Sequence, residues 1–318
     1  MAQLRTLGVT VDVGEARLQR VRDAFPDLEI LVELDLAKAP QALAGVDAIV
    51  GRGAHVNLLA NSRNLRWVQT LTAGSDAVSF DELAKRNVVL TNGSGIHAIN
   101  VAEHLVSLLL AFARALPALF RAQQRHQWFR NTDQFELYGQ TACVVGLGDI
   151  GQAFAERAAA LGMRVTGVRR RELPTPACIT QVATLDTMDP LLAEADHIVI
   201  CLPLTQRTGN IFNADRLALL KPSAYIYNIG RGELIDQEAL IAALRNGRLA
   251  GAGLDVTTPE PLPPDNPLWD MDNVIITAHS SGGSPTRMDR FVDLLIDNIT
   301  RYRNDQPLRN VVDPVEGY

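Results

Sequence analysis

Short apolar runs alternate with helical patterns along most of the chain, and this alternation restricts the fold more than any other feature. Before residue 93 the runs are LGVTVDV (7–13), DAIVG (47–51), LRWVQTL (65–71) and VVLTN (88–92). After residue 140 they are TACVVG, MRVTGV, HIVICLPL, AYIYNIG, AGAGLDV and NVIITAH. Strands separated by helices pair in parallel and are covered by helices on both faces. We therefore expect an α/β protein with doubly wound parallel sheets.

The alternation is interrupted between residues 98 and 116, where apolar residues follow helical spacing. Val101, Leu105, Leu108, Leu109 and Phe112 form one stripe of a long helix. A second amphipathic helix, MDRFVDLLIDNITRYR, follows the last strand and is expected to cross back to the first domain. For 318 residues we predict two domains with a cleft between them: residues 1–97 plus 284–318, and residues 98–283.

Charge and composition limit the partners. The formal net charge is −6, with 47% hydrophobic and 21% charged residues, which is ordinary for a globular protein. A nucleic acid or an anionic membrane requires a basic surface, so we expect neither as a partner. A local basic pocket for a small anion remains compatible with this charge.

The cysteines, the N-terminal segment and the most apolar segment indicate where in the cell the protein is expected. Cys143, Cys178 and Cys201 show no C-x-x-C spacing, so we expect neither a disulfide framework nor a metal site. The segment MAQLRTLGVTVDVGE lacks the apolar core of a signal peptide. The most apolar segment, LVSLLLAFA (105–113), is too short to span a bilayer. We expect a soluble, cytoplasmic protein.

A glycine-rich turn joins a strand to a helix in TACVVGLGDIGQAFAERAAALG, which contains Gly146, Gly148, Asp149, Ile150 and Gly151. G-x-G-x-x-G in this context allows a tight turn, close approach of a pyrophosphate to the helix N-terminus, and close packing of helix and strand. This predicts a dinucleotide site; the alternative is a glycine turn in an unrelated α/β protein. The Asp149 carboxylate is unfavourable beside a pyrophosphate unless its side chain points away.

The strand MRVTGV should end beside the adenosine ribose of that dinucleotide. NAD-specific sites tend to carry an acid there, but this chain has Arg169, Arg170 and Arg171, with no acid before Glu172. A guanidinium suits a 2′-phosphate. We therefore predict a preference for NADP(H), with NAD(H) possible; the alternative is that the arginines are only solvated.

Three chemically useful side chains follow three separate strands. Arg231 lies between Gly230 and Gly232 after AYIYNI, Glu260 lies in TTPEPLPP after AGAGLDV, and His279 ends NVIITAH. Ligands bind at the carboxyl ends of strands in open α/β sheets, so the three could form one catalytic group. Taken singly, Arg231 could be an ion-pair partner, Glu260 a solvated acid and His279 a residue that only ends a strand.

In order, these segments resemble the D-isomer-specific 2-hydroxyacid dehydrogenase family over nearly the whole chain. The resemblance rests on GLGDIG, HIVICLPLTQRTGNIFN, LLKPSAYIYNIGRGELIDQEALIAAL, LAGAGLDVTTPEPLPPDNPLW and NVIITAHSSGGS. It implies a Rossmann-type cofactor domain (98–283) and a flavodoxin-like, discontinuous substrate domain. Ala278 departs from the family, which more often has proline before the histidine.

The resemblance also implies roles for individual residues. Arg231, Glu260 and His279 would be catalytic, and the loop LTAGSD (71–76) would hold the substrate carboxylate through Thr72, Ala73 and Gly74, with Arg231 and His279 also contacting substrate. Asp255 would lie near the nicotinamide amide. Further residues expected to contact the cofactor are Cys201, Leu202, Pro203, Thr208, Ile229, Gly230 and Ser281.

The expected reaction is hydride transfer from NADPH to a 2-oxo acid, such as glyoxylate or hydroxypyruvate, to give the D-2-hydroxy acid. Arg231 would bind the carboxylate and polarise the ketone, and His279 would give the proton, with Glu260 favouring the imidazolium form. The alternative is an NAD(P)H-binding sensor, because the family includes a corepressor. A serine hydrolase is disfavoured because G-x-S-x-G is missing from the sequence.

Several other side chains are left with structural or open assignments. His55, His104, His126 and His197 are expected to be structural or solvated, whereas His97 could border the substrate. By resemblance, the long helix and residues 117–138 suggest a homodimer, in which Trp128 could cap a partner's site.

Overall fold

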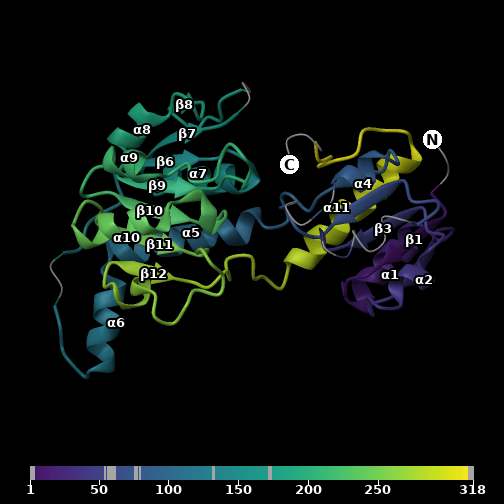
Figure 1. Cartoon of the computed structure of the whole chain (residues 1–318), viewed down its shortest axis with the longest axis horizontal. Coiled ribbons are helices and arrows are strands. Elements are labelled where there is room, and N and C mark those ends of the chain that lie inside the picture. The colour runs from purple at the N-terminus through teal and green to yellow at the C-terminus, as the bar shows by residue number, and fades with distance from the viewer. Residues whose placement is uncertain are drawn as a thin grey trace. The chain divides into compact units, whose positions relative to one another are not determined.

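The structure is a computed structural model that describes residues 4–53, 55, 62–74, 78, 80–130, 133–170 and 174–313 (Figure 1). Ser75, Asp76, Asn131, Thr132, Arg171 and Glu172, which belong to segments considered above, lie outside the described residues. The chain forms two compact units. Unit 1 comprises Met1–His97 and Ser284–Tyr318, and unit 2 comprises Ala98–Gly283.

Unit 1 is built on a five-stranded parallel sheet of order β2-β1-β3-β4-β5. This order is that of flavodoxin-like folds. The strands are β1 (Thr6–Val9), β2 (Glu29–Val32), β3 (Ala48–Gly51), β4 (Trp67–Thr70) and β5 (Val89–Thr91). The helices are α1 (Glu15–Ala24), α2 (Ala39–Ala42), α4 (Phe80–Ala84) and α11 (Arg287–Arg303).

The C-terminal helix α11 completes unit 1. Its apolar face, which includes Phe291 and Leu295, belongs to the same buried cluster as Leu7 and Trp67. Arg17 of α1 is paired with Asp289 of α11 at 2.7 Å. A polar contact adds to this packing, because the buried Asn298 donates to Gln69 of β4 at 2.9 Å.

Unit 2 is built on a seven-stranded parallel sheet of order β12-β11-β10-β9-β6-β7-β8. The strands are β6 (Thr141–Val145), β7 (Arg164–Val168), β8 (Gln181–Ala183), β9 (His197–Ile200), β10 (Tyr225–Asn228), β11 (Gly251–Leu254) and β12 (Val274–Ile276). The helices are α5 (Ala98–Ala113), α6 (Leu116–Gln124), α7 (Asp149–Ala160), α8 (Asp189–Glu194), α9 (Ala214–Ala218), α10 (Gln237–Arg245), η1 (Gly232–Leu234) and η2 (Pro267–Asp270).

The sheet of unit 2 is buried on both faces, as its continuous apolar strands require. In β6, Ala142 and Val144 face the core shared with α5 and α7, whereas Cys143 and Val145 face the core shared with α8, α9 and α10. The strand order reverses between β6 and β9, as in Rossmann folds, so a crevice for a dinucleotide is expected at these strand ends.

Several strands and helices of the structure differ from those predicted from the sequence. Strands β2 and β8 were not predicted, and the strand expected over residues 7–13 ends at Val9. The long helix expected over 98–116 ends at Ala113, because Ala115 adopts a left-handed conformation (φ 53°) before α6 begins.

The helices were compared with the length and hydropathy that a membrane span requires. Among the described residues, no single helix combines the length and hydropathy of a span. The pair α5 and α6 meets that test only when the two are joined, and they are bent by 71° at the break.

Candidate functional site

The glycine turn after β6 has the steric properties of a dinucleotide cradle. Gly146 has φ 111°, and a Cβ there would lie 2.7 Å from the carbonyl of Cys201. A Cβ on Gly151 would lie 2.0 Å from the Gly146 carbonyl oxygen. A Cβ on Gly148 would meet nothing within 4 Å. The outer two glycines are therefore needed for packing, whereas Gly148 borders open space at the N-terminus of α7, where a pyrophosphate would bind.

Residues around this turn have defined positions. Asp149 is exposed and is the first residue of α7, with Ile150 half-buried beside it. Leu202 follows β9, on the other side of the switch point, which is the place between β6 and β9 where the strand order reverses. Leu202 is buried, and a Cβ on Gly230 would lie 2.6 Å from its carbonyl oxygen. The Thr208 hydroxyl fixes the same loop by donating to the Pro203 carbonyl at 2.7 Å.

Cys201 contributes shape rather than thiolate chemistry to this loop. Burial raises the pKa of its thiol to about 12, so the sulfur stays protonated at neutral pH. The neighbouring half-buried Ile229 packs against the core that includes α5 and α7.

The end of β7 carries the two described arginines that were assigned to cofactor selection. Arg169 N–H donates to the Ala183 carbonyl of β8 at 3.0 Å, and its Nη1 donates to the Pro174 carbonyl at 3.2 Å. Arg170 follows directly, and both residues are half-buried. Two cationic side chains therefore stand where the ribose of a dinucleotide would lie in this fold.

The turn after β10 explains the flanking glycines of Arg231. Buried Asn228 spans the turn: its Oδ1 accepts from Gly230 N–H at 3.0 Å and its Nδ2 donates to the Arg231 carbonyl at 2.8 Å. A Cβ on Gly232 would lie 2.1 Å from the Thr257 carbonyl oxygen, so only glycine allows this approach to the segment after β11. Arg231 Nη1 donates to the Gly230 carbonyl at 2.8 Å.

His279 and Glu260 form the most informative contact of the site. Nδ1 of His279 lies 2.8 Å from Oε2 of Glu260, while Oε1 of Glu260 accepts from Thr257 N–H at 3.2 Å. Their side chains are 50% and 39% exposed, so the pair is accessible to a ligand. Because Nδ1 is engaged, Nε2 is the nitrogen that can exchange a proton with a bound molecule.

Asp255 organises the turn that carries His279. Its buried carboxylate Oδ1 accepts from Thr277 Oγ1 at 2.6 Å and from the N–H groups of Ser280 and Ser281 at 2.9 and 3.1 Å. Ala278 and His279 have φ of 48° and 57°, a conformation that non-glycine residues rarely adopt. The hydrogen bonds of Asp255 therefore offset the backbone strain in this turn.

His104 belongs to this network, although no sequence pattern connected it with the site. Its Nε2 lies 3.0 Å from Thr277 Oγ1 and 3.8 Å from Asp255 Oδ1. Since the Thr277 hydroxyl donates to Asp255, its oxygen can accept a hydrogen bond from His104. Asn100, also on α5, donates to the Ser281 carbonyl at 2.8 Å. Helix α5 thus supports both ends of the turn.

The loop after β4 in unit 1 has fixed peptide orientations. The Thr72 carbonyl accepts from Gly93 N–H at 2.9 Å, and the Ala73 carbonyl accepts from Asn92 Nδ2 at 2.8 Å. In a planar trans peptide the N–H points opposite to the C=O. The N–H groups of Ala73 and Gly74 therefore face away from those partners, as binding of a carboxylate would require.

The remaining histidines and Trp128 have different environments. His197 is fully buried, between Gln140 Oε1 (2.6 Å) and the Tyr227 hydroxyl (3.1 Å). His55 Nδ1 lies 3.5 Å from Thr10 Oγ1. Trp128 is 94% exposed. Within the described parts of the chain, no three His, Cys, Asp or Glu side chains are grouped so that they could hold a metal ion.

Comparison with known proteins relates this geometry to one family. Residues 106–281 match the model described as D-isomer specific 2-hydroxyacid dehydrogenase, NAD binding domain. Glyoxylate/hydroxypyruvate reductase B of Pectobacterium carotovorum subsp. carotovorum is 33% identical over 301 residues, which covers 92% of this chain and 90% of that protein.

Solved structures give the same relation. A D-isomer specific 2-hydroxyacid dehydrogenase family protein from Aeromonas salmonicida subsp. salmonicida is 34% identical, with a TM-score of 0.86 over 98% of this chain and 100% of that one. An NADPH-dependent glyoxylate/hydroxypyruvate reductase from Sinorhizobium meliloti, in complex with NADP and sulfate, is 28% identical. Its TM-score is 0.84, over 98% of this chain and 99% of that one.

Proposed function

Because this chain belongs to the D-isomer-specific 2-hydroxyacid dehydrogenase family, it is an oxidoreductase, and we propose that it reduces a short 2-oxo acid to the D-2-hydroxy acid with NADPH. The substrate class that we propose is glyoxylate, hydroxypyruvate or a closely related acid, as in the names of relatives from Pectobacterium and Sinorhizobium. The observation that carries the proposal is the 2.8 Å contact between His279 and Glu260 at the carboxyl edge of the sheet.

The glycine turn and the residues around it fit a dinucleotide. Gly148 borders space that a pyrophosphate could occupy, and Gly146 and Gly151 are required by close backbone contacts. Residues of the loops after β9 and β10, Leu202, Pro203, Ile229 and Gly230, would hold the cofactor from the other side of the switch point. When bound, the nicotinamide supplies hydride chemistry.

Arg231 and the loop Thr72–Gly74 would orient the substrate. The guanidinium can bind the carboxylate and the ketone oxygen of a 2-oxo acid through charge-assisted hydrogen bonds. The outward N–H groups of Ala73 and Gly74 would contact the carboxylate.

His279 would supply the proton. As the carbonyl carbon is reduced, the oxygen becomes an alkoxide and takes the proton from Nε2 of the imidazolium. Glu260 accepts the hydrogen bond from Nδ1, which fixes the ring and compensates its positive charge. In the oxidative direction neutral His279 would accept the hydroxyl proton.

Turnover of a substrate panel tests the function. NADPH and NADH oxidation would be measured with glyoxylate, hydroxypyruvate, pyruvate and bulkier 2-oxo acids. We expect His279→Ala to lower kcat by about 10³-fold or more while cofactor affinity changes less than about threefold, since general acid catalysis typically contributes 10²–10⁴-fold. Loss of cofactor binding instead of turnover would contradict the assignment of His279.

The alternative, a nucleotide-binding sensor, gives a different outcome in the same experiment. Such a protein would bind NADPH, detected by fluorescence, and turn over none of the acids. The pairing of His279 with Glu260 favours an enzyme, because a sensor that only binds a nucleotide does not need a proton donor.

The choice between NADPH and NADH is a separate prediction. Arg169 and Arg170 would bind the 2′-phosphate, which a carboxylate would repel. Arg169→Asp should therefore lower the ratio of kcat/KM for NADPH to that for NADH by about 10²-fold, in line with charge-assisted bonds of 1.5–3 kcal/mol. Arg164→Asp, which changes an exposed arginine at the other end of β7, should leave the ratio unchanged. An unaltered ratio in the Arg169 variant would refute the NADP preference.

A further inference from the structure

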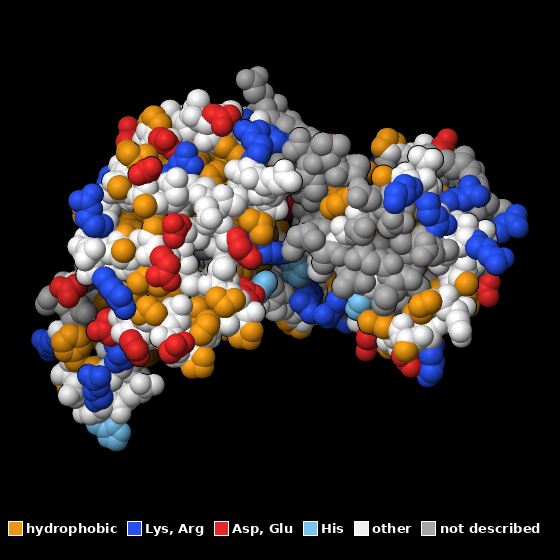
Figure 2. Space-filling view, viewed as in Figure 1, with side chains coloured by type: hydrophobic (Ala, Val, Ile, Leu, Met, Phe, Trp, Pro, Cys, Tyr) orange, Lys and Arg blue, Asp and Glu red, His pale blue; other side chains and the backbone are white. Residues whose placement is uncertain are grey.

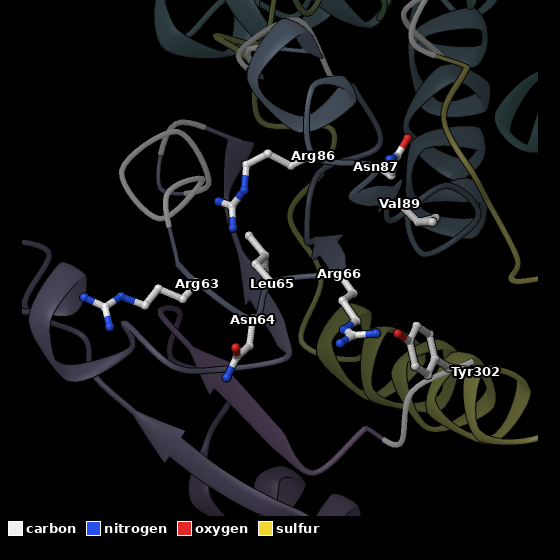
Figure 3. A pocket seen from close by; sticks show the side chains of 8 residues that line it. All are labelled: Arg63, Asn64, Leu65, Arg66, Arg86, Asn87, Val89 and Tyr302. Carbon is white, nitrogen blue, oxygen red and sulfur yellow. The ribbon is translucent and has the colours of Figure 1, made fainter.

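We propose that unit 1 contains a second ligand site, for a small polyanion, away from the strand ends that carry the catalytic chemistry. A cavity with a volume of about 600 Å³ lies on this unit. Its wall includes Arg63, Asn64, Arg66, Arg86, Asn87 and Tyr302 (Figure 3). We infer a binding site here from the position, charge and fixation of these side chains.

The position of the cavity separates it from the substrate loop. Arg66 directly precedes β4, Arg63 lies in the preceding turn, and Arg86 lies in the turn before β5, so they lie near the amino ends of two adjacent parallel strands. The loop 72–74 follows the carboxyl end of β4 and lies at the opposite edge of the same sheet. A ligand in the cavity therefore would not occupy the substrate position.

The charge of the cavity wall is positive and is not balanced locally. Three of the eight lining residues are arginines and none is acidic. In the described part of the chain, none of the three forms an ion pair, whereas Arg17, Arg20 and Arg303 of the same unit are paired with aspartates. Figure 2 shows Lys and Arg side chains gathered on the visible face of unit 1, with few acidic side chains between them. In a chain of net charge −6, this local excess points to an anionic ligand.

The nearby carboxylate of Asp47 is held by backbone and hydroxyl donors rather than by an arginine of the cavity wall. Asp47 Oδ2 accepts from the N–H groups of Arg5 and Thr6, each at 2.9 Å, and from the Thr6 hydroxyl at 3.0 Å. These bonds fix the carboxylate on β1. Its charge and that of Arg66 both act on the Tyr302 hydroxyl: burial raises the pKa of Tyr302, Arg66 opposes the rise and Asp47 adds to it.

Two of the lining side chains are held in place before any ligand binds. Arg86 Nη2 donates to the Ser62 carbonyl, and Arg86 Nη1 is buried without a hydrogen-bond partner. A buried guanidinium N–H without an acceptor is unfavourable, and a nearby anion that accepted its hydrogen bond would offset that cost. Tyr302 is stacked on Trp67 with ring centres 5.8 Å apart. Figure 3 shows the Arg66 guanidinium and the Tyr302 hydroxyl pointing toward one another.

The chemistry of the wall defines the class of ligand. Guanidinium groups bind carboxylates and phosphates through paired hydrogen bonds, and the Asn64 and Asn87 amides can add further donors. Small-molecule sites typically have volumes of about 300–1,000 Å³, so the cavity suits a small molecule rather than a polymer. The ligand that fits is a small anion with at least two carboxylate or phosphate groups.

Calorimetric titration tests this site directly. Citrate and pyrophosphate would be titrated separately into the full-length protein at constant ionic strength, with sodium chloride as the balancing salt. We expect saturable binding of at least one of the two anions, and the preferred one distinguishes a carboxylate site from a phosphate site. In the Arg63→Ala/Arg66→Ala variant the Kd should rise at least tenfold.

Two control variants locate the binding. Arg245→Ala/Arg248→Ala removes the same charge from exposed positions of unit 2 and should change the Kd less than twofold. Arg231→Ala should also leave it unchanged, because the proposed substrate position is elsewhere. Arg66→Gln is a milder second variant, with an expected loss of threefold or more. Binding that is weak and unsaturable, equal in the Arg63/Arg66 variant, or lost with Arg231 would overturn the proposal.

Discussion

At the scale of single residues, Thr277 links His104 of α5 to Asp255, whose carboxylate organises the turn that carries His279. The Thr277 hydroxyl donates to Asp255 at 2.6 Å and lies 3.0 Å from His104 Nε2. Thr277→Val keeps the shape but removes both bonds, so the strained turn over Ala278 and His279 should loosen. We expect kcat for 2-oxo acid reduction to fall about 10–100-fold, since small misplacements of catalytic groups have effects of this size.

Thr277→Ser keeps the hydroxyl and is the matched control, with kcat expected within about threefold of the wild type, because the same donor and acceptor remain. A steady-state comparison of the two variants, with melting curves to confirm folding, separates positioning from stability. Equal kcat values in the valine and serine variants would show that the hydroxyl does not hold the turn.

Residues of this kind mark the boundary of what the sequence could predict. Arg231, Glu260 and His279 could be placed at one sheet edge because parallel strands all end on the same side. His104 could not be connected with Asp255, because the link runs through Thr277, which is 173 positions from His104, and depends on how α5 packs on the sheet. Hydrophobic periodicity places His104 on a helix but does not specify its polar neighbour.

At the scale of elements, the prediction missed two strands at the edges of their sheets. The buried strands β3, β6 and β9 have continuous apolar sequences and were expected. The strands β2 and β8 lie at the edges of their sheets, and their residues are exposed or half-buried. QVA is only three residues long, and EILV is followed directly by the charged segment ELD, so neither was recognised as a strand.

Strand β9 also carries a prediction about pH, because its first residue is His197. Burial lowers the pKa of His197 from 6.5 to about 4, with the charge of Asp196 acting in the opposite direction. The unfolded chain then binds a proton near pH 6.5 that the folded chain does not bind until about pH 4. Stability should therefore fall as the pH decreases through this range, by about 3 kcal/mol in total at about 1.4 kcal/mol per pH unit.

Denaturant unfolding at several pH values from 7 to 4 measures this contribution. His197→Gln can still form side-chain hydrogen bonds toward Gln140 and Tyr227 but cannot titrate, so its stability should fall less over the same range. The difference between the two proteins isolates His197 from the carboxylates that also titrate. Parallel stability curves would show that His197 is not protonated on unfolding.

At the scale of the whole molecule, we predict a homodimer formed through unit 2. The segment from α6 to β6 exposes large aromatic side chains: Phe120 is 57% exposed, Phe129 49%, Tyr138 79% and Trp128 94%. Side chains of this size are unfavourable in water and are enriched at protein interfaces.

Sedimentation velocity tests this assembly at several protein concentrations. We expect the wild type to sediment as a dimer near 69 kDa, about twice the mass of the 34.6 kDa chain. Phe120→Glu/Trp128→Glu places two charges in the aromatic segment and should give a monomer. The control is Leu219→Glu, which places a charge at an exposed apolar position at the end of α9, away from the aromatic segment in the sequence of unit 2. A wild-type protein that stays monomeric at high concentration would refute the dimer. Equal dissociation by the Leu219 change would exclude the aromatic segment as its interface.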